Sequence, residues 1–380
     1  MHELTAADGR PGPHVILMSG TSWAGASSRY HVHVPVNAVL LPPAQETEAI
    51  AKSEFRKEFL TGPDGNMLRL SGAPPSRRPV VLEQMLTQLA TPAIPGDPSP
   101  LASELDAIAD PNRRRILLLT GSYEEAKLAV RILESIPEWA GRLCRLVPDD
   151  ADLDHTWQLA GTGVNGRGRT LRRGDIAGFA GTGADVLVAP LLAVERGHNI
   201  LNQAGQAAIG SVYFLARPHH RPDDITLAVQ AINDWAVRAA RDGTFARLVS
   251  EHGSLDVAGS AFRQKARGLW RHLLTRRIAW SSLPRREQES FTWDQLVVMW
   301  QVIGRLVRGG VPARVAFVDA AFAPRDASLT GADTPSTSLL HSMHEVLRPY
   351  FGPGSSVAAA DREIVGMLYE PFYRAVDRML

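Results

Sequence analysis

From residue 113 onward, the chain alternates short, almost wholly apolar segments with amphipathic ones. The apolar segments are RRRILLLT at 113–120, RLCRLVP at 142–148, ADVLVAP at 184–190, SVYFLARP at 211–218 and ARVAFVDAA at 313–321. Strands that are apolar along their whole length are buried on both faces, which is typical of a parallel sheet. The sequence therefore predicts an α/β fold, with a parallel sheet covered by helices on both faces.

Other segments extend this pattern. Strands are predicted at 14–20 and 32–41, where β-branched residues are punctuated by proline and glycine. Helices are predicted near 46–60, 80–90, 122–136, 172–180, 337–349 and 358–379, and 91–100 is a loop. Residues 224–300 are mostly helical in pattern.

Four parts follow along the chain. Residues 1–45 hold strands that lead into the domain, and residues 46–112 are a variable linker or insert. Residues 113–324 are the α/β domain, with a helical insertion at about 225–298. Residues 325–380 form a C-terminal extension, a pair of helices.

Composition limits the function classes. The single cysteine, Cys144, excludes an internal disulfide and a metal site built from cysteines. The net charge of +1 gives no global preference for nucleic acid, so any basic surface must be local. No apolar run approaches a membrane span, and no signal-peptide core is present at the N-terminus. We expect a cytoplasmic protein without a membrane partner, and no metal site, because His31, His33, His219 and His220 have no carboxylate or cysteine nearby in the sequence.

The segment QVIGRLVRGG at 301–310 carries the most specific motif. Arg305 and Arg308 are three residues apart, so on a helix they project from one face. Gly304 beside them leaves room for a close approach to the backbone. Two guanidiniums on a rigid element suit a multi-charged anion such as a nucleotide phosphate. The alternative is a solvated basic helix end before a buried strand.

Polar and glycine-rich residues follow several of the predicted strands. They are Ser19-Gly20-Thr21, Gly121-Ser122-Tyr123, PLLAVERGHNI at 190–200 and RPHHRPDD at 217–224. Ligands of parallel α/β sheets gather at the carboxyl ends of the strands, so we expect Ser122, Gly197 and Arg305 near one common edge. Each set by itself is also typical of a turn followed by a helix cap.

The order of these motifs resembles the second half of superfamily 2 helicases, particularly the DinG/XPD-like branch, over roughly residues 14–324. Ser19-Gly20-Thr21 resembles motif III, Ser122-Tyr123 motif IV, Gly197 to Ile200 motif V, and Gln301 to Arg308 motif VI, with 218–224 and 319–322 as their following segments. Asn199 stands where the branch usually has aspartate, and 42–112 has no clear counterpart. The resemblance implies a RecA-like fold of the P-loop NTPase type.

The resemblance also implies roles for single residues. Arg305 and Arg308 would act catalytically on the γ-phosphate, with Gln301, Gly304, Gly197 and Asn199 on the ATP side of the cleft. Ser19, Thr21, Ser122 and Tyr123 would contact nucleic acid. Neither G-x-x-x-x-G-K-S/T nor a D-E-x-H or D-E-x-D segment occurs, so the groups that cradle ATP phosphates and hold Mg²⁺ are missing. We therefore expect ATP and Mg²⁺ to bind only with a Walker A/B-bearing RecA-like domain, on another chain or an upstream segment, and no ATP hydrolysis by this chain alone.

Residues 261–286 form a locally basic segment with eight Lys/Arg residues and no acidic one. Trp270 and Trp280 interleave with them, a composition that suits phosphate contact and base stacking on single-stranded DNA or RNA. The candidate contacts are Trp270, Arg271, Arg276 and Arg277. The alternative is an amphipathic helix with its tryptophans in the core and its arginines in water.

Two functions follow from these residues. The first is a C-terminal helicase domain that binds single-stranded nucleic acid and completes an ATPase site. The second is a non-catalytic nucleic-acid-binding or scaffold subunit of a DNA-processing or defence complex. A nucleotide-binding metabolic enzyme is disfavoured by the missing phosphate loop.

Overall fold

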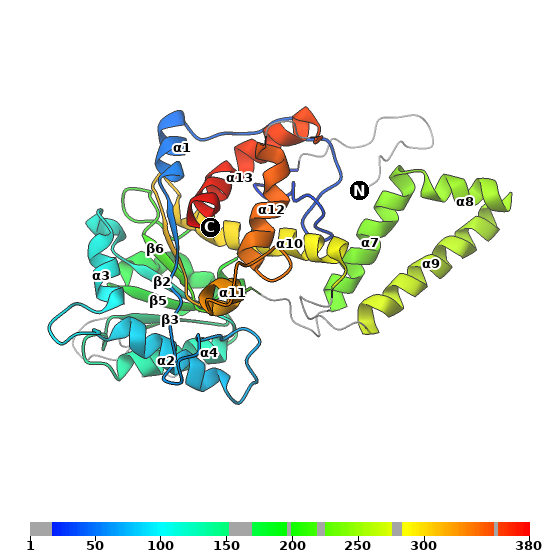
Figure 1. The fold of residues 1–380 in the computed structure, drawn as a ribbon. Helices are drawn as coiled ribbons and strands as arrows, with labels where there is room; N and C mark the ends of the chain where they lie inside the picture. The colour runs from blue at the N-terminus through cyan, green and yellow to red at the C-terminus, as the bar shows by residue number, and fades with distance from the viewer. Residues whose placement is uncertain (1–16, 152–168, 196–198, 219–224, 276–282, 353–355) are drawn as a thin grey trace.

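The computed structural model describes residues 17–151, 169–195, 199–218, 225–275, 283–352 and 356–380. Its centre is a seven-stranded sheet in the order β1-β7-β6-β2-β5-β3-β4 (Figure 1). Every neighbouring pair of strands is parallel. The predicted α/β class is confirmed, and the arrangement is consistent with a RecA-like fold.

The strands are short, and the predicted ones from residue 113 onward are present. Their bounds are β1 (Glu54–Lys57), β2 (Ile116–Thr120), β3 (Leu143–Val147), β4 (Arg169–Arg172), β5 (Val186–Pro190), β6 (Ser211–Phe214) and β7 (Arg314–Phe317). In the central register, Leu118 of β2 lies between Val188 of β5 and Tyr213 of β6. The edge strands β1 and β4 were not predicted, because their charged sequences EFRK and RTLR lack the apolar signature of buried strands.

The helices are α1 (Ala44–Ala51), α2 (Arg78–Ala90), α3 (Pro100–Ala107), α4 (Tyr123–Glu134), α6 (Leu191–Val194), α7 (Ile225–Arg241), α8 (Thr244–His252), α9 (Leu255–Thr275), α10 (Arg285–Leu306), α11 (Pro324–Ala327), α12 (Leu339–Phe351) and α13 (Ala359–Met379). Short 3₁₀ helices are η1 (Pro111–Arg113), η3 (Arg173–Gly181) and η5 (Ala320–Phe322). The C-terminal pair is confirmed as α12 and α13. No helix within the described ranges is long and apolar enough to span a membrane.

The alternation of side chains along the strands divides the core into two layers. Leu117 and Leu119 belong to the cluster that includes α10, α12 and α13. Leu118, between them, belongs to the cluster that includes α2, α3 and α4. Because successive side chains of a strand point to opposite faces, helices cover both faces of the sheet.

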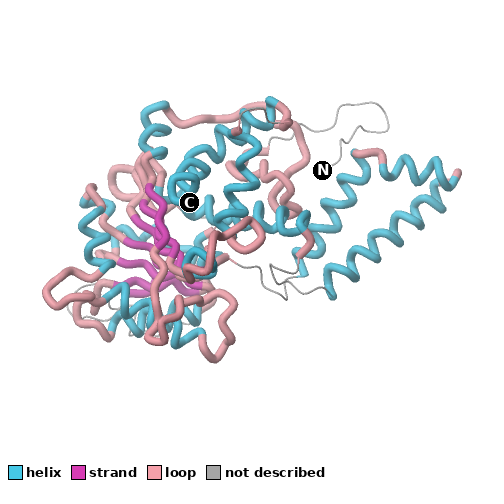
Figure 2. The backbone as a smooth tube through the Cα atoms, in the orientation of Figure 1, coloured by secondary structure: helices cyan, strands magenta, loops and turns pink. Residues whose placement is uncertain are grey.

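The predicted helical insertion is present and has an unusual shape. Helices α7, α8 and α9 form an arm that extends away from the sheet, whereas α10 returns to pack on the sheet (Figures 1 and 2). Inside the arm, the rings of Trp235 and Phe262 stack at 4.7 Å, and Phe245 packs edge-on against Phe262. The arm therefore has a small aromatic core of its own. We refer to α7–α9 as the helical arm.

Two predictions for the first 60 residues are wrong. Residues 17–20 and 32–41 form no strand; they belong to a segment, residues 17–43, that crosses the helical side of the molecule. Prolines at 35, 42 and 43 provide no amide hydrogen for a strand ladder. The helix predicted near 46–60 ends at Ala51, because residues 54–57 pair with β7 instead. Residues 46–112 thereby contribute β1, α2 and α3 to the sheet and its covering layer.

Candidate phosphate-binding pocket

A pocket of about 450 Å³ lies at the C-terminal end of α10. The chain after α6 and the start of the crossing segment, residues 17–43, complete its walls. Its lining comes from three distant parts of the sequence: Ser19, Gly20, Thr21, Glu195, Asn199, Trp300, Gln301, Gly304, Arg305 and Arg308. The structure thus brings the residues predicted as motifs III, V and VI to one place. We refer to this cavity as the phosphate pocket.

Helix α10 presents three of these residues on one side, and Arg308 follows two residues after the end of the helix. Gln301, Gly304, Arg305 and Arg308 follow the spacing of a single helix face. Val302, Ile303 and Leu306, which alternate with them, are buried in the core. A Cβ atom at Gly304 would meet no described atom within 4 Å, so this position is open towards the pocket. The alternation fixes the helix on the sheet and leaves both arginines at the cavity.

The electrostatics of the pocket favour an anion. Burial lowers the pKa of Arg305 from its ordinary value, and the positive charge of Arg308 lowers it further, whereas Glu195 acts in the opposite direction. Arg305 still keeps its charge at neutral pH, because a guanidinium is among the most basic side chains of proteins. A multi-charged anion between Arg305 and Arg308 would relieve the repulsion of the two cations and could accept bidentate hydrogen bonds.

The lining residue Glu195 and its partner Tyr30 were not predicted from the sequence. The Glu195 carboxylate is buried, and its Oε1 accepts a hydrogen bond from the Tyr30 hydroxyl at 2.5 Å. Glu195 stands two residues before Gly197 in PLLAVERGHNI, so its place next to a recognised motif was the available signal. Tyr30 had no such signal, because its position depends on the fold of the crossing segment. Trp300, another unpredicted lining residue, donates its indole N–H to the Leu368 carbonyl at 2.9 Å.

The Ser19-Gly20-Thr21 segment lies in the same pocket as the arginines. Gln301 Nε2 donates to Thr21 Oγ1 at 2.8 Å, and the Thr21 amide donates to Ser19 Oγ at 3.2 Å. Ser19 and Thr21 were predicted as nucleic-acid contacts. Their position beside Gln301 and Arg305 places them in the phosphate pocket.

The predicted common edge is wrong for Ser122 and Arg305. Ser122 follows the carboxyl end of β2, where its Oγ accepts from the Glu125 amide at 3.1 Å and caps α4. The α10 residue after Arg305, Leu306, is held at the amino end of the strands by Arg113, three residues before β2. Tyr123, in the first turn of α4, is also absent from the pocket lining. The two positions are separated by the length of a strand because α10 runs back along the sheet.

Several predicted residues lie outside the described ranges. They are Gly197, Arg276 and Arg277, together with Trp280 and residues 219–224. Asn199, the other motif V position, is exposed and lines the phosphate pocket.

The basic segment lies largely on α9 of the helical arm. Arg263, Arg267 and Arg271 are all exposed and four residues apart, so they form one stripe along the helix. Lys265 is exposed beside them, and Trp270 is half-buried. Because a helix rises 1.5 Å per residue, arginines four residues apart place a cation about every 6 Å along the stripe. A row of charges is suited to a repeating polyanion.

The histidines have partners that the sequence did not reveal. His33 Nε2 lies 2.6 Å from Asp234 Oδ1 on α7, so a carboxylate does stand close to this histidine. His31 and His33 lie ring to ring at 4.6 Å, and His31 Nδ1 accepts from the Ala24 amide at 3.2 Å. Within the described ranges, no group of three or more metal-ligating side chains forms a metal site.

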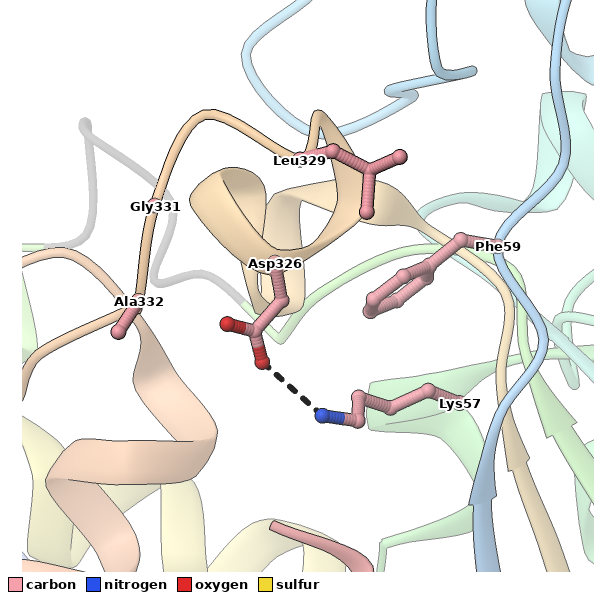
Figure 3. Close-up of a pocket in the computed structure, with 6 residues that line it drawn as sticks. All are labelled: Lys57, Phe59, Asp326, Leu329, Gly331 and Ala332. Carbon is pink, nitrogen blue, oxygen red and sulfur yellow. Dashed lines mark hydrogen bonds and ion pairs between the residues drawn. The ribbon is translucent and has the colours of Figure 1, made fainter.

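A second cavity of about 450 Å³ lies at the carboxyl end of β1 (Figure 3). Its lysine, Lys57, is already bound to Asp326, with Nζ 2.9 Å from Oδ2. The other lining residues, Phe59, Leu329, Gly331 and Ala332, carry no charge. This cavity is therefore less suited to a polyanion than the phosphate pocket, where two arginines meet.

Comparisons with family models, curated proteins and solved structures found no match to the chain.

Proposed function

We propose that this chain is the C-terminal, helicase-like half of a two-part ATPase that acts on single-stranded nucleic acid. In this proposal, Arg305 and Arg308 contact the phosphates of an ATP molecule bound to a second RecA-like domain. That domain, which carries the Walker A and B residues, lies on a partner chain or an upstream segment. Closure of the two domains around ATP would drive movement along the nucleic acid.

One observation carries the proposal. Thr21, Asn199 and the two arginines at 305 and 308 come from segments that are far apart in the sequence, and they line one cavity. These are the segments that resemble helicase motifs III, V and VI, in that order. An ordinary basic helix end would not require the other two segments beside it. Their convergence supports a shared ligand site.

The same residues support the need for a partner. The pocket lining offers cations and hydrogen-bonding groups, and its one carboxylate, Glu195, is engaged by Tyr30. Phosphoryl transfer also needs a phosphate-cradling loop and carboxylate-held Mg²⁺, and the sequence holds no segment for either. The pocket is suited to stabilise charge on a phosphate that another domain presents.

The helical arm supports the nucleic-acid part of the proposal. The exposed stripe of Arg263, Arg267 and Arg271 concentrates positive charge that the net charge of +1 conceals. DNA and RNA fit this stripe equally well, because phosphate contacts carry no sequence information.

The test is binding of inorganic tripolyphosphate to the purified chain, measured by calorimetry. We expect Arg305→Ala to weaken tripolyphosphate binding about tenfold or more, the value of one charge-assisted hydrogen bond. Arg131→Ala, an exposed arginine on α4, is the matched control and should have no effect.

Two outcomes would contradict parts of the proposal. Magnesium-dependent ATP turnover by the chain alone, abolished by a substitution within it, would overturn the half-site. If the chain binds an oligonucleotide but no tripolyphosphate, the non-catalytic scaffold subunit is the remaining function.

A further inference from the structure

Residues 22–32 of the crossing segment form a closed loop between the phosphate pocket and the helical arm. The Val32 amide donates to the Ser22 carbonyl at 2.8 Å and brings the two ends of the loop together. Compact loops whose ends adjoin are frequently functional. The residues just outside this closing bond, Thr21 and His33, are consequently neighbours in space. We refer to residues 21–33 as the coupling loop.

One end of the coupling loop belongs to the phosphate pocket. Thr21 lines the cavity and accepts the hydrogen bond from Gln301 at 2.8 Å. A second contact comes from within the loop, where Tyr30 holds the pocket carboxylate of Glu195. A ligand that displaces Gln301 or Glu195 must therefore act on this loop.

The other end belongs to the arm. His33 Nε2 lies 2.6 Å from Asp234 Oδ1, and Asp234 is on α7. The second oxygen of Asp234 accepts from Arg238 Nε at 2.9 Å, one turn further along the same helix. This contact joins the coupling loop to the root of the arm that carries the arginine stripe.

The body of the loop is anchored to two helices, α10 and α13. Ser27 donates to Asp294 of α10 at 2.5 Å, and both side chains are buried. Tyr369 of α13 donates to the Trp23 carbonyl at 2.9 Å. Gly25, with a φ of +47°, fits closely against Trp293, where a Cβ would lie 2.3 Å from the ring. With the body of the loop anchored, Thr21 and His33 are linked most directly through the Val32–Ser22 bond that closes the loop.

We propose that the coupling loop links the phosphate pocket to the helical arm, so that phosphate binding in the pocket stiffens the arm and strengthens its hold on nucleic acid. This inference rests on the proposed function and adds its regulation. Phosphate binding orders Gln301 and Thr21 in advance, so less conformational entropy is lost when the helical arm binds nucleic acid. The two binding events therefore show positive cooperativity. By linkage, nucleic acid on the arm strengthens phosphate binding by the same factor.

Amide hydrogen exchange across α7–α9 tests the coupling without any ligand. Thr21→Val keeps the size of the side chain and removes the hydrogen bond from Gln301. We expect exchange in α7 to become at least about fivefold faster, the lower end of typical coupling between sites. Thr182→Val, whose hydroxyl bonds the Phe179 carbonyl outside the loop, is the control and should leave α7 unchanged. Equal α7 exchange in Thr21→Val and the parent chain would overturn the inference.

A second hydrogen-exchange measurement adds tripolyphosphate. In the parent chain we expect slower exchange in α7, and in His33→Ala this protection should disappear while the pocket still binds. Asp234→Ala removes the same contact from the arm side and serves if His33→Ala fails to fold. Protection that persists in a folded variant would also count against the coupling. If the parent chain binds no tripolyphosphate, the proposed function fails, and the ligand-free Thr21→Val result decides the coupling separately.

Discussion

Arg113 donates a hydrogen bond to the backbone carbonyl of Leu306 over 2.8 Å and thereby fixes the end of α10 next to Arg305. The same buried guanidinium also bonds the carbonyls of Ala207, Ile209 and Pro312. Arg113, which precedes β2, thus holds the end of α10 and the segments that lead into β6 and β7. The position of the pocket arginines depends on it.

Replacing Arg113 by methionine should lower the free energy of unfolding by at least about 3 kcal/mol, because several buried carbonyls lose their donor and each costs about 1–3 kcal/mol. Urea unfolding of the two chains measures this difference. Arg114→Met is the matched control: this exposed arginine bonds one carbonyl, that of Ile108, at 3.1 Å. A loss as large in the control as in Arg113→Met would show that the clamp has no special role.

Gly25→Ala should destabilise the coupling loop against Trp293. A Cβ at this position combines positive φ with a distance of 2.3 Å to the indole ring, so the cost should be about 1–3 kcal/mol or more. Gly65 also has positive φ, at +75°, but a Cβ there would meet no described atom within 4 Å. Thermal unfolding of both alanine variants separates steric overlap from backbone strain, and equal shifts would contradict the packing described for the loop.

The stability of the chain should fall with pH through His31. Burial lowers the pKa of His31 from 6.5 to about 4, and the charges of His33 and Arg238 contribute in the same direction. Since protonation is easier in the unfolded chain, the stabilisation is complete above pH 6.5 and is lost as the pH falls from 6.5 towards 4.

His31→Asn should flatten this dependence, because an amide oxygen can replace Nδ1 as the acceptor for the Ala24 amide without titrating. Denaturant midpoints between pH 4 and pH 8 give the comparison. His252→Asn changes an exposed histidine at the end of α8 and should leave the slope as it is. An unchanged slope in His31→Asn would assign the loss of stability to other groups.

Binding of a single-stranded oligonucleotide should depend on salt through the arginine stripe. Removing Arg263, Arg267 and Arg271 together should reduce the slope of log affinity against log salt by up to about 2, at about 0.7 for each phosphate contact. A triple variant of Arg77, Lys127 and Arg131, which are exposed and lie outside the arm, changes the net charge equally. Fluorescence anisotropy at several salt concentrations measures these slopes. Equal slopes in both triple variants would show that the helical arm is not part of the binding surface.

Trp270→Ala should weaken oligonucleotide binding without altering the salt slope. Stacking of one base on an aromatic ring contributes about 1–3 kcal/mol and involves no counterion release. The same titrations measure it, with unfolding of the variant recorded alongside. A loss of about 3–5 kcal/mol in stability with unchanged binding would instead identify Trp270 as a core residue of the arm.

The parallel sheet and the pocket-facing side of α10 follow from local sequence patterns. Segments such as ILLLT and VLVAP are apolar along their whole length, and only strands buried on both faces require this. The spacing of three and four residues predicted that Gln301, Gly304, Arg305 and Arg308 share one side, because residues at that spacing are neighbours on a helix surface. Edge strands escaped prediction because β1 and β4 are charged and gain their structure from pairing with β7 and β3.

Which of these motifs meet depends on packing between elements that are distant in the sequence. Thr21 and Gln301 are 280 residues apart and share a hydrogen bond, whereas Ser122 and Arg305, predicted at one edge, are held at opposite ends of the strands. Sequence patterns report periodicity within an element, since they arise from burial of one face or two. The convergence of Thr21, Asn199 and Arg305, and the path of residues 17–43 across the helices, depend on packing between distant elements such as the Ser27–Asp294 contact. No local pattern encodes a contact of that kind, because each partner is an ordinary polar residue until the fold buries both.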